Sequence, residues 1–78
     1  MPLINKNPIQ ASGIATIIAG NTSTVVNHKL GGVPIWIGIT PLGNLGHWYI
    51  TAKDETSFTV EFAVSPDSNI DFLWKAEL

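Results

Sequence analysis

The sequence of 78 residues contains no cysteine, no arginine and no long run of apolar residues. Without cysteine the chain forms neither a disulfide framework nor a thiolate zinc site. Its only strong bases are four scattered lysines and its net charge is −2, which argues against nucleic-acid binding, because that function needs clustered basic side chains. No stretch is long enough to span a membrane as an apolar helix. The first ten residues lack the apolar segment of a signal peptide, so we expect a protein that is not secreted by that route.

Sequence motifs of catalysis are also missing. There is no Gly-x-Ser-x-Gly elbow and no glycine-rich phosphate motif, and the glycine pairs fall between predicted strands. The six carboxylates fall mostly in predicted turns or on outward positions, where nothing raises their pKa for acid catalysis. We therefore expect no enzyme and no cofactor.

What the chain does contain is typical of one small folded domain. Hydrophobic residues make up 45% of the sequence and charged residues only 13%, with three Trp and three Phe, which argues against disorder. Residues 1–12 carry two prolines and no sustained period, so we interpret them as an N-terminal arm that precedes a β-sandwich domain at 13–78. Six short segments separated by turn-forming residues predict the strands of this all-β, antiparallel sandwich. Their ranges are 13–19, 23–28, 34–40, 47–53, 57–64 and 69–78.

Apolar residues alternate along most of these segments, which predicts one inward face for each strand. In the second segment Val26 extends the pattern, and in the first either Ile14 or Ile17 faces inward. The predicted inward sets are Ile35, Ile37 and Ile39; Trp48, Ile50 and Ala52; Phe58, Val60 and Phe62; and Ile70, Phe72, Trp74 and Ala76.

The outward positions also carry large apolar groups, namely Trp36, Tyr49 and Leu73. Single exposed hydrophobic residues are normal on soluble proteins, and that remains one interpretation. A contact surface is the other, since such groups on the outer face of a thin sandwich suggest contact with a partner. A chain this small without disulfides or a metal is commonly stabilised by association. We therefore expect Trp36, Tyr49 and Leu73 to form an oligomer interface.

Two histidines and a group of aromatic and amide side chains are the remaining candidates for chemistry. We expect His28 to point inward and to hydrogen-bond a loop backbone, although copies of one histidine around a symmetry axis could hold an ion. Two distant histidines without cysteine are a poor zinc site, so we expect no metal. Asn44, His47 and Tyr49 are candidate carbohydrate-binding residues, because aromatic rings stack on sugars while polar groups bind their hydroxyls.

Over residues 13–76 the ordered string of turns and core positions resembles small β modules of bacteriophage tail-fibre and other virion-surface proteins. The matching stretches are residues 13–17, 20–23 and 26–31, then Pro34, Ile37, residues 39–41, 45–46, 48–50, 57–60 and 72–76. These modules are similar to H-type lectin domains, which are six-stranded antiparallel sandwiches that assemble as trimers.

The resemblance implies a homotrimeric structural protein of the virion surface, either a capsid decoration protein or a tail or fibre component, with other virion proteins as partners. H-type lectins bind sugars through an arginine beside a Trp and a His; here His47 and Trp48 are present and arginine is absent, which favours a structural role. The alternative is a carbohydrate-binding module that attaches the virion to a host-surface glycan.

Overall fold

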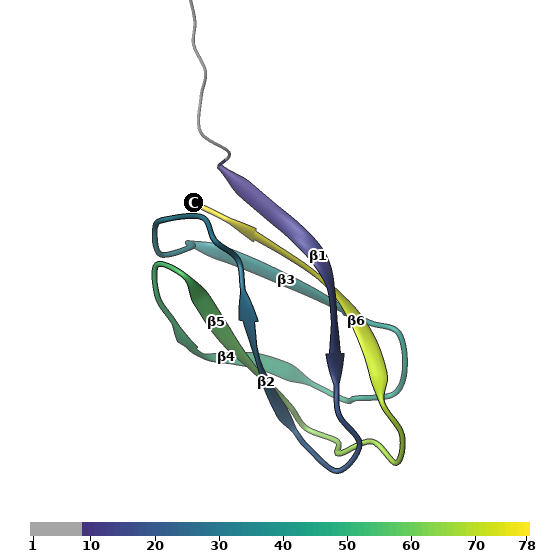
Figure 1. Ribbon diagram of the computed structural model, residues 1–78. Coiled ribbons are helices and arrows are strands. Elements are labelled where there is room, and N and C mark those ends of the chain that lie inside the picture. Colours follow the sequence, from purple (N-terminus) through teal and green to yellow (C-terminus); the bar gives the residue numbers. More distant parts are fainter. Residues whose placement is uncertain (1–8) are drawn as a thin grey trace, which may run out of the picture.

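The computed structural model describes residues 9–78 and confirms the all-β class. No helix occurs in this described part, and therefore none that could cross a membrane. Six strands follow one another along the chain (Figure 1). They are β1 (Gln10–Ile17), β2 (Ser23–Asn27), β3 (Trp36–Pro41), β4 (Trp48–Lys53), β5 (Ser57–Phe62) and β6 (Ile70–Glu77).

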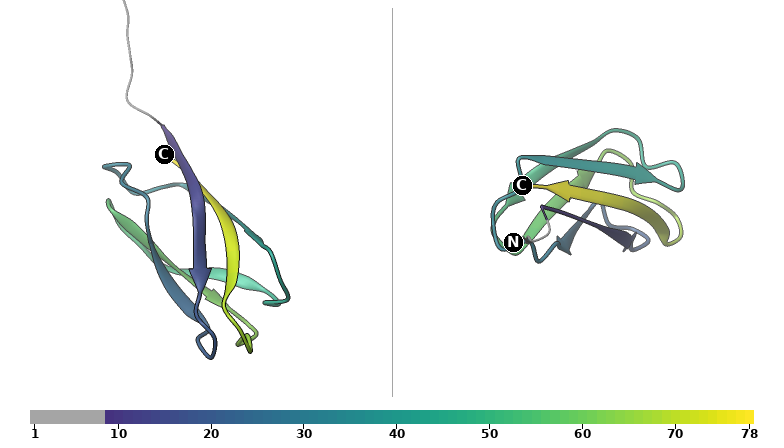
Figure 2. Two further views of the ribbon diagram at one scale, coloured as in Figure 1. Left: turned by 45° about the vertical axis from the view of Figure 1, so that its right-hand side comes forward. Right: turned by 90° about the horizontal axis from the view of Figure 1, so that it is seen from above.

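The strands form two antiparallel sheets of three strands each. We call the sheet with the order β1-β6-β3 sheet A and the sheet with the order β2-β5-β4 sheet B. In Figure 2, β1, β6 and β3 run side by side in that order. The chain changes sheet between β3 and β4, so these consecutive strands do not pair, and each is an outer strand of its own sheet.

Side chains from both sheets meet in one apolar core, in which two aromatic pairs join the central strands β5 and β6. The rings of Phe62 and Phe72 contact edge to face with centroids 5.3 Å apart, and those of Phe58 and Trp74 do so at 5.8 Å. Such pairs add about 0.5–1.5 kcal/mol to the gain from burial. The buried apolar residues of this core are Ile17, Val26, Ile39, Leu45, Phe58, Val60, Phe62, Phe72 and Ala76.

The predicted inward faces are largely confirmed. Of the alternating sets, Ile39, Phe58, Val60, Phe62, Phe72 and Ala76 are buried. Ile37, Trp48, Ile50, Ile70 and Trp74 pack against this core but are only partly buried. In β1 the inward residue is Ile17, whereas Ile14 is exposed. Three of the partly buried residues lie on β3 or β4, where no further strand covers the edge.

Two residues of those sets are not inward, and both predictions were wrong for a local reason. Ile35 is 79% exposed because β3 begins one residue later, at Trp36. Ala52 is exposed because β4 carries a bulge: Ile50 pairs with Val60, but Ala52 pairs with Thr59. The extra residue reverses the alternation, so Ala52 takes an outward position and Lys53 an inward one.

The first strand starts earlier than the predicted position 13. Gln10, Ala11 and Ser12 pair with Glu77, Ala76 and Lys75, because β6 is long enough to provide them with partners. The sequence 10–12 has no strand pattern of its own, so its structure depends on this pairing. The rest of the predicted arm, residues 1–8, lies outside the described residues.

Candidate functional site

Two of the predicted interface residues lie on the outer face of sheet A. Trp36 is 50% exposed and Leu73 is 41% exposed, although both sit within paired strands. Leu73 pairs with Ile14 of β1, which is also exposed, so two large apolar side chains stand next to each other across the strands. We call Ile14, Trp36 and Leu73 the sheet A apolar face. Because paired backbone fixes their positions, these groups are presented to solvent without a flexible segment.

The indole of Trp36 lies over Gly38 of its own strand. A Cβ atom built on Gly38 would overlap the Trp36 ring, so the absence of a side chain at position 38 provides the space for the ring. Leu73 and Lys75 border the same hollow as Trp36, together with Ile39, Thr40, Trp48 and Trp74; its volume is about 440 Å³. Trp36 is therefore the most prominent aromatic group on sheet A that solvent reaches.

The third predicted interface residue lies elsewhere. Tyr49 is 56% exposed, but it belongs to β4 of sheet B, where it pairs with Glu61 on the side away from the core. Tyr49 and the sheet A apolar face therefore project from different sheets. A single flat contact cannot include all three predicted residues, and a contact that includes them must wrap around the edge formed by β3 and β4.

The predicted carbohydrate-binding residues lie near this edge but line neither of the two larger hollows of the described residues. Asn44 and His47 are exposed in the connection from β3 to β4, and Tyr49 follows in β4. The backbone of this connection is held by Ala63, whose N–H donates to the His47 carbonyl, and by Val64, whose N–H donates to Leu45. Within residues 9–78 these three residues are exposed, and they line none of the three hollows described by their walls.

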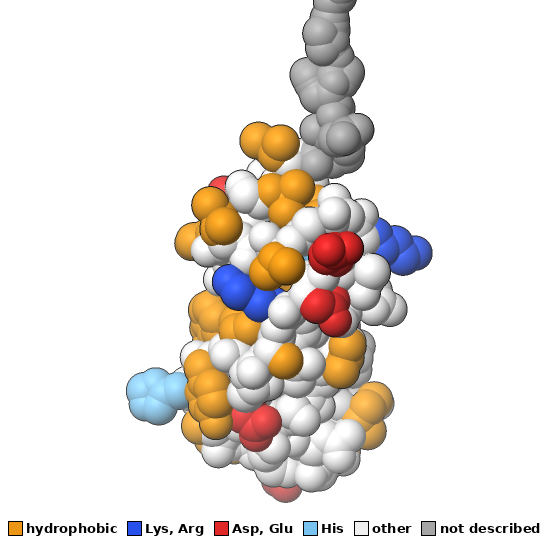
Figure 3. Space-filling model, turned by 90° about the vertical axis from the view of Figure 1, so that its left-hand side faces the viewer, with side chains coloured by type: hydrophobic (Ala, Val, Ile, Leu, Met, Phe, Trp, Pro, Cys, Tyr) orange, Lys and Arg blue, Asp and Glu red, His pale blue; other side chains and the backbone are white. Residues whose placement is uncertain are grey.

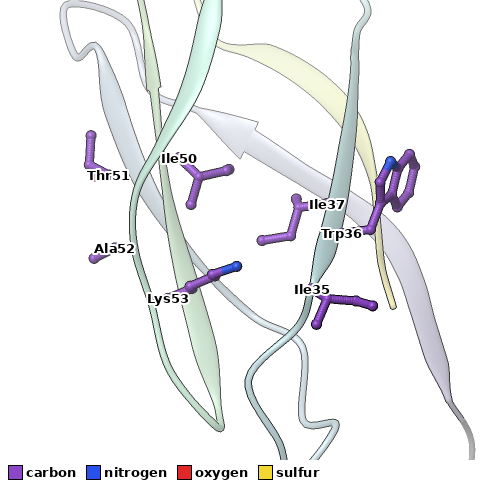
Figure 4. Close-up of a pocket in the computed structure, with 7 residues that line it drawn as sticks. All are labelled: Ile35, Trp36, Ile37, Ile50, Thr51, Ala52 and Lys53. Atoms are coloured by element: carbon purple, nitrogen blue, oxygen red, sulfur yellow. The ribbon is translucent and has the colours of Figure 1, made fainter. Parts of the chain in front are cut away.

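A hollow of about 590 Å³ lies between β3 and β4 and had no counterpart in the sequence prediction. We call it the β3–β4 groove; its walls are Ile35, Trp36 and Ile37 on one side and residues 50–53 on the other. Figure 4 shows Ile37 and Ile50 pointing toward each other across it, while Trp36 points away from it. At the opposite edge of the sheets β1 and β2 are in contact, and β3 and β4 have no comparable contact.

The bulge in β4 shapes this groove. Since it turns Lys53 inward, the ammonium group crosses the gap and donates a hydrogen bond of 2.8 Å to the Pro34 carbonyl. In Figure 4 the Lys53 side chain extends between the strands toward Ile35. The aliphatic part of Lys53 thereby adds to an apolar lining while its charge is held at one end. The alternation of the sequence alone did not indicate this, because nothing in it marks the bulge.

His28 has the structural role that the sequence suggested. It is buried and stacks on Phe58, with ring centroids 6.4 Å apart. Its Nδ1 accepts a hydrogen bond from the Leu30 N–H at 3.0 Å, so Nε2 carries the proton and donates to the Asp54 carbonyl at 2.9 Å. Both ring nitrogens are thus used by the loops on either side. No group of three or more His, Asp or Glu side chains that could hold a metal ion occurs within residues 9–78.

Asp54 organises the turn between β4 and β5. Its Oδ1 accepts hydrogen bonds of 2.8 Å from the backbone N–H groups of Thr56 and Ser57, and one of 3.1 Å from the Thr56 hydroxyl. The Thr56 N–H, followed by the Ser57 N–H, holds the pKa of Asp54 below its ordinary value of 3.8, because these donors favour the charged form. Since its carboxylate is occupied by the turn, Asp54 has a structural role here.

Charged groups are sparse on much of the surface. Figure 3 shows hydrophobic side chains distributed from one end of the molecule to the other on the side it displays, with few acidic and basic groups between them. One ion pair joins Lys75 and Glu77 at 3.4 Å on the outer face of sheet A, and both side chains are about half exposed. An exposed pair of this kind contributes little to stability, about 0–1 kcal/mol. Comparison of the sequence with protein-family models and with curated proteins finds no match.

Proposed function

We propose that this protein is a non-enzymatic structural component of a virion surface, built as a β-sandwich that forms homotrimers. The observation that carries the proposal is the sheet A apolar face, where Ile14, Trp36 and Leu73 are held exposed on rigid, paired strands. The resemblance to modules of phage tail fibres and other virion-surface proteins supports the location. The protein would either decorate a capsid or complete a tail or fibre.

Burial of this face provides the energy for assembly. An aromatic side chain buries about 150–250 Å² when it is fully enclosed. Trp36 is half exposed, so a partner would remove roughly 100 Å² of it from water, which corresponds to about 2.5 kcal/mol at 25 cal/mol per Å². Leu73 and Ile14 add to this in every subunit, and closed rotational symmetry limits the association to a defined oligomer. The wrapped contact that includes Tyr49 is compatible with a ring in which each subunit touches two neighbours.

The interface has a direct mutational test. Trp36→Glu places a charge at the centre of the contact, where burial without a partner is costly, so we expect monomers. Val25→Glu is the matched control, since Val25 is exposed on β2 of the other sheet and outside the proposed contact; we expect it to keep the oligomer. Equal dissociation of both variants, or of neither, would contradict the assignment of this interface.

The location is tested by the composition of purified virions. We expect the protein in stoichiometric amounts, in a fixed ratio to a capsid, tail or fibre protein. Its absence from purified particles would end the proposal that it is a virion component.

A second candidate function is attachment to a host-surface glycan. The feature that favours it is the hollow of about 440 Å³ on sheet A, where Trp36 provides a stacking surface beside the polar groups of Thr40 and Lys75. These residues differ from the predicted set of Asn44, His47 and Tyr49, so the two sites are separable. A glycan array probed with the wild-type oligomer and with Trp36→Ala and Tyr49→Ala tests both. Uniformly blank arrays with the wild type would exclude this function.

A further inference from the structure

Strand β1 has a free edge within the described residues. It is an outer strand of sheet A, with β6 as its neighbour (Figure 2). Strand β2 lies near β1, but within residues 9–78 no backbone hydrogen bond joins the two strands. A free strand edge presents unpaired N–H and C=O groups, and these can pair with another strand.

The edge of β1 lacks the features with which outer strands usually avoid such pairing. Those features are shortness, proline, bulges and charged side chains. Strand β2 has five residues, β3 ends at Pro41, and β4 carries both a bulge and Lys53. The eight residues of β1 contain no charge and no proline, and their register with β6 runs without a shift. Of the outer strands in the described part, β1 is therefore the best suited to accept another strand.

Two hydrogen bonds of β6 show which backbone groups of β1 are free. The Leu78 N–H donates to the Ile9 carbonyl at 2.8 Å, and the Leu42 N–H donates to the Asp71 carbonyl at 3.0 Å. Successive residues of an antiparallel strand turn their backbone groups to opposite sides, so the even-numbered residues of β6 face β1. Their partners in β1 are the odd-numbered residues. The residues whose N–H and C=O groups point to the free edge are Gln10, Ser12, Ile14 and Thr16.

We propose that this edge pairs with β1 of a second copy, antiparallel and around a twofold axis, so that two copies of sheet A become one continuous sheet. The axis passes through Gly13, with Ser12 opposite Ile14 and Gln10 opposite Thr16 of the other copy. Each of these pairs exchanges two hydrogen bonds, so the register uses all the free backbone groups of β1. The pairing does not depend on the proposed virion function or on trimer formation.

The composition of β1 favours a copy of itself as the partner. Like charges on opposed strands are destabilising, but residues 10–17 carry no charge that would repel the same strand of another copy. In the proposed register the two Ile14 side chains are diagonal neighbours on the outer face of the joined sheet. Ile14 is 67% exposed and belongs to the sheet A apolar face, so pairing makes the apolar faces of two copies continuous. A twofold contact uses the same edge of both copies and leaves none of it open to a further strand.

The size of the contact predicts weak pairing. Eight extended residues cover about 27 Å, and one layer of a sandwich is about 10 Å thick. The paired strip therefore covers roughly 270 Å² on each copy, about 540 Å² in total, whereas stable contacts bury about 1,200–2,000 Å². We therefore expect pairing at millimolar but not at micromolar concentration.

Hydrogen exchange of single amides tests the pairing in the full-length protein, measured by NMR at micromolar and at millimolar concentration. We expect the amides of Ser12, Ile14 and Thr16 to exchange slower by about fivefold or more at millimolar concentration, because pairing protects them. The Ala11 and Gly13 amides face β6 and should be protected at both concentrations.

Val25 provides the matched control amide in the same molecule. The Phe62 N–H donates to the Thr22 carbonyl, so the even-numbered residues of β2 face β5 and the Val25 amide faces the free edge of sheet B. Its exchange rate should be the same at both concentrations. Trp36→Glu, which removes the proposed trimer contact, should keep the slower exchange of the β1 amides at millimolar concentration. Failure of the trimer and failure of the pairing are thereby distinguished.

Ser12→Pro blocks the free edge, because it removes one donor and places a ring there, while the hydrogen bonds to β6 do not use the Ser12 N–H. We expect this variant to lose the concentration dependence at Ile14 and Thr16, and Ser12→Ala to retain it. Protected Ala11 and Gly13 amides show that β1 of the variant still pairs with β6. Where they are not protected, Ser12→Lys takes its place, since it sets like charges on the two sides of the axis.

Three results would overturn the proposal. The first is fast exchange of the Ser12, Ile14 and Thr16 amides at both concentrations. The second is protection of these amides at both concentrations, because the edge would then already be covered at micromolar concentration. The third is a concentration dependence that persists in the blocking variant with β1 intact, because association would then use another surface.

Discussion

Replacing Phe72 with alanine tests the packing of the core most severely. Phe72 lies in the central strand of sheet A, is 0% exposed, and contacts Phe62 of sheet B edge to face. Its removal takes away the transfer energy of the ring, the aromatic contact and the filling of the space between the sheets. Truncation of a buried Phe costs about 3–5 kcal/mol. A domain of this size has a total stability of roughly 4–12 kcal/mol at 0.05–0.15 kcal/mol per residue, so much of it would be lost.

The assay is equilibrium unfolding in urea, followed by tryptophan fluorescence. Phe72→Leu, which retains most of the side-chain volume, should cost about 1.5 kcal/mol or less. Val25→Ala, at an exposed position of β2, should cost less than about 1 kcal/mol. A loss below about 1 kcal/mol for Phe72→Ala would refute the described packing, because a fully enclosed ring between two sheets cannot be removed at so small a cost.

Three further predictions concern the loops. Gly46→Ala should lower the free energy of unfolding by about 1–2 kcal/mol, because Gly46 has a positive φ of 71° that alanine adopts only with strain. A steric cost adds to this loss, because the new Cβ would lie 2.9 Å from the Val64 side chain. Gly20→Ala, with a φ of 85° but nothing within 4 Å, should cost the backbone part alone, and equal losses in thermal unfolding would contradict the contact with Val64. His28→Ala leaves the Leu30 N–H and the Asp54 carbonyl without their partner, so it should lower the free energy of unfolding by about 1–3 kcal/mol for each of these buried groups. A loss below about 1 kcal/mol in urea unfolding would show that water takes the place of the imidazole. The folded-state pKa of Asp54 is lowered, so the stabilisation that its carboxylate provides should be fully present at neutral pH and vanish as the pH falls below 3.8. The difference in unfolding free energy between the wild type and Asp54→Ala should therefore shrink over that range. A difference that does not change with pH would contradict this role of Asp54.

The strands and most of the core were predictable because burial on one face imposes alternation. Phe58, Val60, Phe62, Phe72 and Ala76 lie on the central strands β5 and β6, where both neighbours are present and the pattern is regular. The same reasoning placed His28 inward, because it continues the alternation of Val26. These predictions required only local periodicity.

The features that shape the candidate site could not be read from periodicity. The bulge in β4 inserts one residue, and no glycine or proline in β4 marks it, so Ala52 was assigned inward although it lies outward. The position of Tyr49 relative to Trp36 depends on which strands share a sheet. Alternation along one strand contains no information on this, because pairing is set by contacts between distant segments. The β3–β4 groove results from both effects together.

The measurement that tests the central claim most directly is sedimentation equilibrium of the full-length protein at micromolar concentration. A homotrimer joined through the sheet A apolar face predicts a mass of about 25 kDa, three times the chain mass of 8.4 kDa, and a shift toward the monomer for Trp36→Glu but not for Val25→Glu. A stable, folded wild-type monomer of 8.4 kDa at that concentration would contradict it.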